Sequence, residues 1–69
     1  MQNFGWAFLG CGGIAHTVVR ELIKDGGKIV ACWNRTEERA RQFAAQYGAT
    51  AYLDAREALT AKGVNGAYI

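Results

Sequence analysis

The stretch FLGCGGIAHT, residues 8–17, separates an unbroken apolar run from a run with helical periodicity. It holds Gly10, Gly12 and Gly13, with the small Ala15 close behind. Ordered glycine loses more conformational entropy on folding than any other residue, so this concentration needs a structural reason. The runs on either side of the glycines supply that reason, and they also decide the fold.

The apolar residues before the glycines predict a strand, and those after them predict a helix. Residues 6–9 are apolar without interruption, which is typical of a strand that is covered on both faces in a parallel sheet. Ile14, Val18 and Leu22 recur every four residues, so they line one face of a helix. The sequence Asp-Gly-Gly at residues 25–27 ends that helix, because glycine commonly follows a helix C-terminus.

The rest of the chain repeats the alternation of strand and helix. A second buried strand is expected over residues 28–33, and Thr36 is expected to be the N-cap of a second helix. A short extended piece over residues 51–53 and a short helix over residues 55–60 precede a third strand over residues 64–69. This order predicts an α/β protein with a partial Rossmann (doubly wound) fold, in which three parallel strands in the order 3-2-1 are joined by crossover helices.

Composition and charge exclude several classes of protein. The chain has 69 residues, of which 51% are hydrophobic, and a formal net charge of +2. Such a small, evenly spread charge predicts neither a nucleic-acid partner nor a membrane partner. No apolar run reaches the roughly 18–20 residues of a membrane span, and the first ten residues lack the basic region of a secretory signal. We therefore expect a cytoplasmic protein.

The cysteines and the chain length bound what else the protein contains. Cys11 and Cys32 lack metal-ligand spacing and His16 is the only histidine, so we expect reduced thiols and no metal site. A chain this short buries only about 60% of its unfolded surface and is marginal unless helped. We therefore expect residues 1–69 to be a fragment of a longer protein, or a domain that lacks its partners.

The glycine-rich stretch itself matches the dinucleotide-binding fingerprint G-x-G-x-x-G/A, between a strand and a helix as that fingerprint requires. In such a motif Gly10 allows the tight turn, Gly12 leaves the backbone open to a diphosphate, and Ala15 lets the helix pack closely. The free N–H groups at the start of the helix hold the phosphates. A plain structural turn is the alternative. The expected phosphate-binding residues are Gly10, Cys11, Gly12, Gly13, Ile14 and Ala15.

The tip of the second strand reads Asn34-Arg35-Thr36, about 20 residues further on, where a ribose-reading residue belongs. NAD sites usually place Asp or Glu there, and a carboxylate would repel a 2′-phosphate. Asn34 can bond the ribose without a charge, Arg35 can pair with a 2′-phosphate, and Thr36 can add a hydroxyl or an N–H group. We therefore favour NADP over NAD. The competing interpretation is a turn asparagine, a solvated arginine and an N-cap threonine.

Other side chains are weaker candidates for the cofactor site. His16 is expected to be partly exposed at the helix start rather than a phosphate ligand, because its charge would oppose the helix dipole. Arg39 and Arg41 are expected on the solvated face of the second helix. The aromatic residues expected in the core are Trp33, Phe43 and Tyr47. No catalytic set is evident, so the catalytic residues stay unknown.

Three stretches resemble the N-terminal Rossmann domain of the Gfo/Idh/MocA oxidoreductases, which include glucose–fructose oxidoreductase, inositol dehydrogenase and dihydrodiol dehydrogenase. They are GWAFLGCGGIAHTVVREL, IVACWNRTEERARQFAAQYGA, and AYLDAREAL followed by VNGAYI. The resemblance implies hydride transfer between NAD(P) and the CH–OH or carbonyl carbon of a sugar, polyol or diol. It also implies a C-terminal domain that carries a lysine acid/base. Asn65 stands where the family commonly has Asp, a departure expected to matter little.

By position in this family, residues 10–15 would form the phosphate loop and residues 34–36 would read the ribose. We expect a small-molecule substrate, and a homo-oligomer, if there is one, to form through the C-terminal domain. The resemblance implies that residues 1–69 are the N-terminal part of an NAD(P)-binding Rossmann domain and that the substrate domain is absent from this chain. The 69 residues alone are expected to be inactive. Two alternatives stay open: a nucleotide-binding regulatory module without catalysis and, less favoured, an S-adenosylmethionine-binding methyltransferase domain. Asn34 argues against the methyltransferase, which usually keeps an acid at that position.

Overall fold

Strands and helices alternate along residues 4–69, the part of the chain that the computed structural model describes. The strands are β1 (Phe4–Leu9), β2 (Gly27–Trp33), β3 (Thr50–Ala51) and β4 (Gly66–Tyr68). The helices are α1 (Gly13–Lys24), α2 (Glu37–Tyr47) and α3 (Ala55–Leu59). Residues 1–3, which begin the stretch where no secretory signal is expected, lie outside the described residues. Within residues 4–69, none of the helices is long and apolar enough to span a bilayer.

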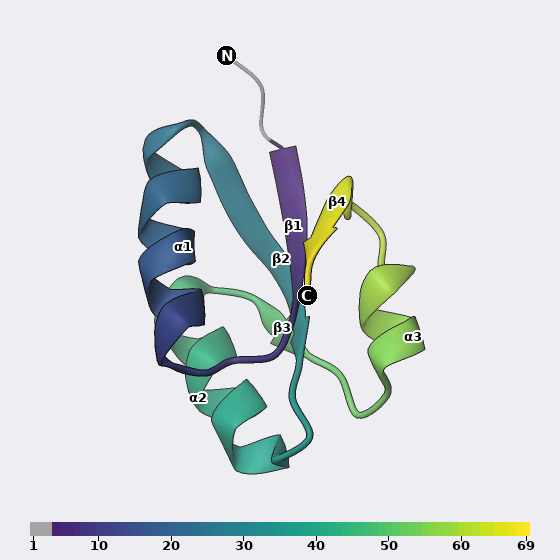
Figure 1. The fold of residues 1–69 in the computed structure, drawn as a ribbon. Coiled ribbons are helices and arrows are strands. Elements are labelled where there is room, and N and C mark those ends of the chain that lie inside the picture. The colour runs from purple at the N-terminus through teal and green to yellow at the C-terminus, as the bar shows by residue number, and fades with distance from the viewer. Residues whose placement is uncertain (1–3) are drawn as a thin grey trace.

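The four strands form one parallel sheet in the order β3-β2-β1-β4. Helices α1 and α2 cover one face of this sheet, and α3 covers the other (Figure 1). Helices on both faces of a parallel sheet make a doubly wound α/β fold. The predicted fold class, the parallel strands and the order 3-2-1 are therefore confirmed.

The sheet has four strands, one more than expected, and its last strand lies at the edge of β1. β3 arises from the expected short extended piece and pairs with β2 through Cys32 and Ala51. The strand expected third, over residues 64–69, is instead β4, which pairs with β1 through Phe8 and Tyr68. Parallel crossovers are right-handed, so a connection over the opposite face moves the chain the opposite way across the sheet. Because α3 lies on that opposite face, β4 joins the free edge of β1.

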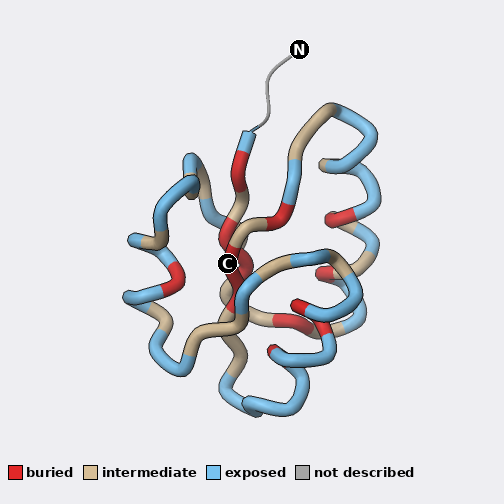
Figure 2. The backbone as a smooth tube through the Cα atoms, turned by 180° about the vertical axis from the view of Figure 1, so that it is seen from behind, coloured by how far each residue is buried: buried red, intermediate tan, exposed pale blue. Residues whose placement is uncertain are grey.

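Two apolar clusters hold the layers together, one on each face of the sheet. The larger lies under α1 and α2 and contains Phe8, Val19 and Phe43, whereas the smaller lies under α3 around Ala7 and Ala31. Side chains alternate between the faces of a strand, so neighbouring residues of β1 enter different clusters. Figure 2 shows the buried residues gathered at the sheet and on the inner sides of the helices. The predicted core positions of Trp33, Phe43 and Tyr47 are confirmed, with Phe43 only 1% exposed.

β4 is attached to β1 by a reciprocal pair of hydrogen bonds just before its first residue. The backbone N–H of Asn65 donates to the carbonyl oxygen of Gly5 (2.7 Å), and the N–H of Gly5 donates to Oδ1 of Asn65 (2.8 Å). The side chain of Asn65 therefore completes a pairing that the strand backbone alone does not make.

Gly5 also generates a stability prediction, because a Cβ there would lie 1.9 Å from the carbonyl oxygen of Gly63. The backbone would have to move to accept it, so Gly5→Ala should lower the free energy of unfolding by about 3 kcal/mol in urea denaturation. Gly13→Ala is the matched control, since a Cβ at Gly13 meets nothing within 4 Å. The control should change stability by less than about 0.5 kcal/mol. Equal losses in the two variants would contradict the close approach.

Candidate functional site

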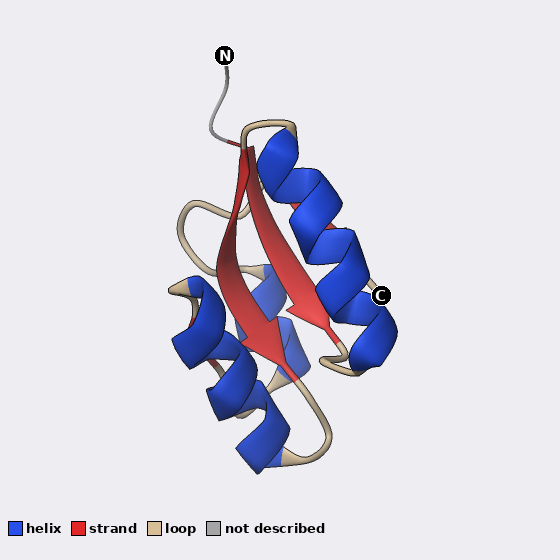
Figure 3. Cartoon of the chain, turned by 90° about the vertical axis from the view of Figure 1, so that its left-hand side faces the viewer, coloured by secondary structure: helices blue, strands red, loops and turns tan. Residues whose placement is uncertain are grey.

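The glycine-rich turn and the tip of β2 lie side by side where β1 and β2 end (Figure 3). The N–H of Gly10 donates to the carbonyl oxygen of Trp33 (2.8 Å), and the N–H of Cys11 donates to Oδ1 of Asn34 (3.0 Å). Nδ2 of Asn34 donates in turn to the carbonyl oxygen of Thr36 (3.1 Å). Asn34, which the sequence assigns to the ribose, thus uses both of its polar side-chain atoms within the protein and joins the two predicted parts of the site.

The next backbone N–H groups along the chain have no acceptor. Within residues 4–69, the N–H groups of Gly12, Gly13 and Ile14 form no hydrogen bond. They lie at the start of α1, where a helix has no internal acceptor for them. A Cβ at Gly12 or Gly13 would meet nothing within 4 Å, so space lies beside these groups. Unpaired N–H groups at a helix N-terminus beside open space suit a phosphate.

Gly10 and Ala15 have the backbone and the packing that the fingerprint requires. Gly10 has φ of +120°, a conformation that residues with a side chain rarely adopt. Ala15 is 4% exposed and belongs to the cluster under α1, so the helix approaches the strands closely. Ile14 is 74% exposed and takes no part in this packing. Ile14 therefore offers a ligand its backbone N–H group.

The side chains of Arg35 and Thr36 are exposed at the tip of β2. Thr36 occupies the N-cap position of α2, as predicted, but its hydroxyl makes no capping hydrogen bond. Arg35 forms no hydrogen bond or ion pair with the described residues. Both side chains are therefore accessible from the same edge as the glycine-rich turn.

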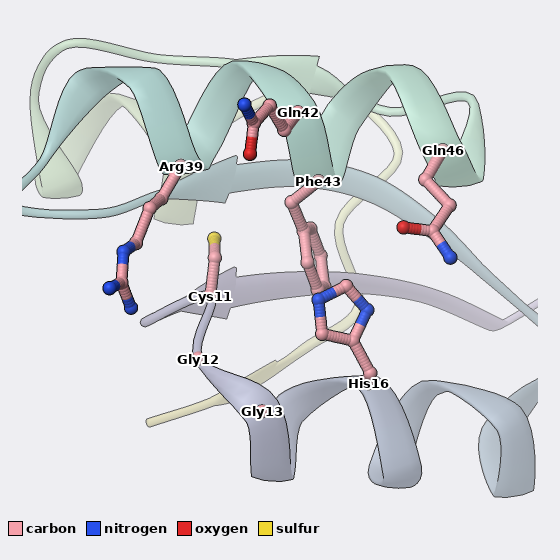
Figure 4. A pocket seen from close by; sticks show the side chains of 8 residues that line it. All are labelled: Cys11, Gly12, Gly13, His16, Arg39, Gln42, Phe43 and Gln46. Atoms are coloured by element: carbon pink, nitrogen blue, oxygen red, sulfur yellow. The ribbon is translucent and has the colours of Figure 1, made fainter.

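A pocket of about 380 Å³ lies between the start of α1 and the inner side of α2 (Figure 4). Its lining residues are Cys11, Gly12, Gly13, His16, Arg39, Gln42, Phe43 and Gln46. The open space beside the unpaired N–H groups of α1 is thus part of a larger hollow whose far wall is α2.

Arg39 extends from α2 toward the turn at Cys11 and Gly12 (Figure 4). The sequence did not predict this place of Arg39 in the pocket. The two carboxylates of the first turn of α2 have other partners, because Arg41 pairs with Glu37 and Gln42 donates to Glu38 (3.3 Å). Arg39 has no acidic partner in the described part of the chain. Arg39 and Arg41 are both exposed, as predicted, and Arg39 also adds an uncompensated positive charge to the pocket.

Both cysteines are buried free thiols beside the turn. Sγ of Cys32 lies 3.3 Å from the carbonyl oxygen of Ala40, and Sγ of Cys11 lies 3.7 Å from that of Trp33. Hydrogen bonding to Cys11 and burial raise the pKa of the Cys32 thiol, which keeps it neutral. No group of three or more metal-ligating side chains occurs in residues 4–69. Cys11 and Cys32 both belong to the apolar cluster under α1 and α2, so the two side chains pack beneath the turn.

A protein-family comparison identifies the family. Residues 6–64 match the model described as "NADP oxidoreductase coenzyme F420-dependent". The chain belongs to this family. The sequence-based prediction of an NAD(P)-binding, Rossmann-like domain of an oxidoreductase is thereby confirmed, and membership of the Gfo/Idh/MocA family stays a prediction.

Two solved structures are similar to this oxidoreductase domain. The WlbA dehydrogenase from Bordetella pertussis, in complex with NADH and UDP-GlcNAcA, has a TM-score of 0.83 at 16% identity, over 97% of this chain and 21% of that one. The shikimate dehydrogenase from Aquifex aeolicus has a TM-score of 0.69 at 29% identity, over 84% of this chain and 21% of that one. The chain thus spans about a fifth of the length of each. No curated protein sequence matches it.

The hydrogen bond from the N–H of Cys11 to Asn34 should contribute to the stability of this domain. Asn34→Ala leaves the N–H of the buried Cys11 without its acceptor, so the free energy of unfolding should fall by about 1–3 kcal/mol in urea denaturation. Asn34→Asp keeps an acceptor oxygen for that N–H group, so its free energy of unfolding should fall by clearly less. If both variants are as stable as the wild type, the bond does not hold the turn.

Proposed function

We propose that the glycine-rich turn of this chain holds the diphosphate of NADP. One observation carries the proposal: the N–H groups of Gly12, Gly13 and Ile14 have no acceptor, and Gly12 and Gly13 line an open pocket. These three residues would bind phosphate oxygens, Gly10 and Ala15 would shape the turn, and the buried Cys11 would support it. The bound cofactor would supply hydride chemistry at its nicotinamide.

The preference for NADP rests on charge at the end of β2. Asn34 is neutral where NAD sites usually carry a carboxylate, so nothing at that position repels a 2′-phosphate. Arg35 and Arg39 are exposed, and neither has an acidic partner among the described residues. A guanidinium pairs with phosphate through two parallel hydrogen bonds, and Thr36 could add its uncommitted hydroxyl. The description of the family names NADP as well.

The hydride partner of the whole protein is proposed to be a sugar, polyol or diol, as the resemblance to the Gfo/Idh/MocA oxidoreductases implies. The structure of WlbA dehydrogenase contains a nucleotide sugar, UDP-GlcNAcA, which supports a substrate of this kind. We propose that a separate C-terminal domain carries the substrate pocket, the lysine acid/base and any contact between subunits. The family description favours a second candidate, coenzyme F420, as the hydride partner.

Substitution of the two arginines tests the cofactor preference in the full-length protein. Arg35→Ala and Arg39→Ala should each weaken NADPH binding about tenfold in a fluorescence titration, because each removes a charged hydrogen bond. Affinity for NADH, which lacks the 2′-phosphate, should change less than about twofold by the same reasoning. Arg41→Ala is the matched control, since Arg41 pairs with Glu37 outside the pocket. Equal losses for NADPH and NADH would refute the NADP preference.

A hydride-transfer assay of the full-length protein tests the reaction class. With NADP present, reduction of the nicotinamide should require a sugar, polyol or diol as the hydride donor. A second assay replaces that donor with reduced F420 and tests the second candidate. Binding of NADPH without turnover of either class would favour the regulatory module that lacks catalysis.

A further inference from the structure

His16 and Tyr47 join the start of α1 to the end of α2 beside the pocket. Nδ1 of His16 lies 2.6 Å from the hydroxyl oxygen of Tyr47, and the two rings have centroids 5.5 Å apart. Phe43 packs against both rings, with centroid distances of 5.2 Å to His16 and 4.9 Å to Tyr47. Packing and the hydrogen bond together fix the orientation of the imidazole.

The fixed orientation leaves one ring nitrogen for a ligand. Nδ1 is engaged by Tyr47, whereas Nε2 has no hydrogen-bond partner among the described residues. Figure 4 shows the ring rising from α1 toward Phe43, with its other nitrogen turned to the side of the pocket where Cys11 lies. Nε2 and the unpaired N–H groups of Gly12 and Gly13 therefore border the same hollow.

A tyrosine hydroxyl both donates and accepts hydrogen bonds, so Tyr47 can serve either tautomer of the imidazole. When the hydroxyl donates to Nδ1, the proton of the neutral ring lies on Nε2, which becomes a donor toward the pocket. An anion in the pocket favours this arrangement. The donor form needs no positive charge, so the helix dipole, which opposes a charged histidine at this position, does not oppose it.

We propose that His16 donates a hydrogen bond from Nε2 to a phosphate group of the bound dinucleotide, and that Tyr47 is the positioning residue that turns Nε2 toward it. The inference rests on the proposed function, because it adds a side-chain donor to the same site. The phosphate is either the diphosphate or the 2′-phosphate. His16 would bind the diphosphate jointly with the glycine-rich turn, or the 2′-phosphate jointly with Arg39.

The experiment compares two amide substitutions at His16 in the full-length protein. Gln places an amide nitrogen near the position of Nε2, whereas the shorter Asn places one near the position of Nδ1. His16→Asn should weaken NADPH binding about tenfold in isothermal titration, and His16→Gln should stay within about threefold of the wild type. Tyr47→Phe should weaken binding about threefold by freeing the ring, and Thr17→Ala, on the exposed part of α1, should have no effect.

NADH titrations identify the phosphate. A loss for NADPH alone assigns His16 to the 2′-phosphate, and equal losses for NADPH and NADH assign it to the diphosphate; both results support the proposal. If His16 only fills space between the helices, both variants will lower the melting temperature alike and bind as the wild type does, which overturns it. Equal losses of affinity in His16→Gln and His16→Asn overturn it too. A wild-type protein that binds neither dinucleotide refutes the proposed function instead.

Discussion

The site depends on the two hydrogen bonds that attach the glycine-rich turn to the end of β2. Gly10 and Cys11 give their N–H groups to Trp33 and Asn34, and the chain then enters α1 with its next N–H groups unpaired. A turn left unattached could satisfy those groups by rearranging around them. Because these two bonds hold the turn, the N–H groups at the start of α1 stay unpaired beside the pocket.

The same attachment brings α2 into the site. Asn34 links the turn to Thr36, the N-cap residue of α2, and so ties the start of α2 to the start of α1. The inner side of α2 then faces the turn with a cation and two amides, while its carboxylates pair along the helix. The pocket consequently has backbone donors on one wall and a positive side chain on the other, an arrangement that attracts anions.

Much of this could be predicted from local sequence. Glycine spacing and apolar periodicity are properties of short segments, and they predicted the glycine-rich turn and the alternation of strands and helices. β3 has only two residues, too few for a pattern, and the place of β4 depends on which face α3 covers. The contacts of Arg39, His16 and Tyr47 depend on how α1 and α2 pack together, which no single helix encodes.

The contact between Asn65 and Gly5 does not depend on the protonation of a carboxyl group. Its side-chain oxygen bonds the N–H of Gly5 while its own N–H bonds the carbonyl of the same residue. An aspartate could make this contact, but its oxygen would be protonated as the solution approached the ordinary carboxyl pKa of about 3.9. The amide of asparagine does not titrate there. The contact of Asn65 with Gly5 therefore keeps the same chemical form from neutral solution to a pH below about 4.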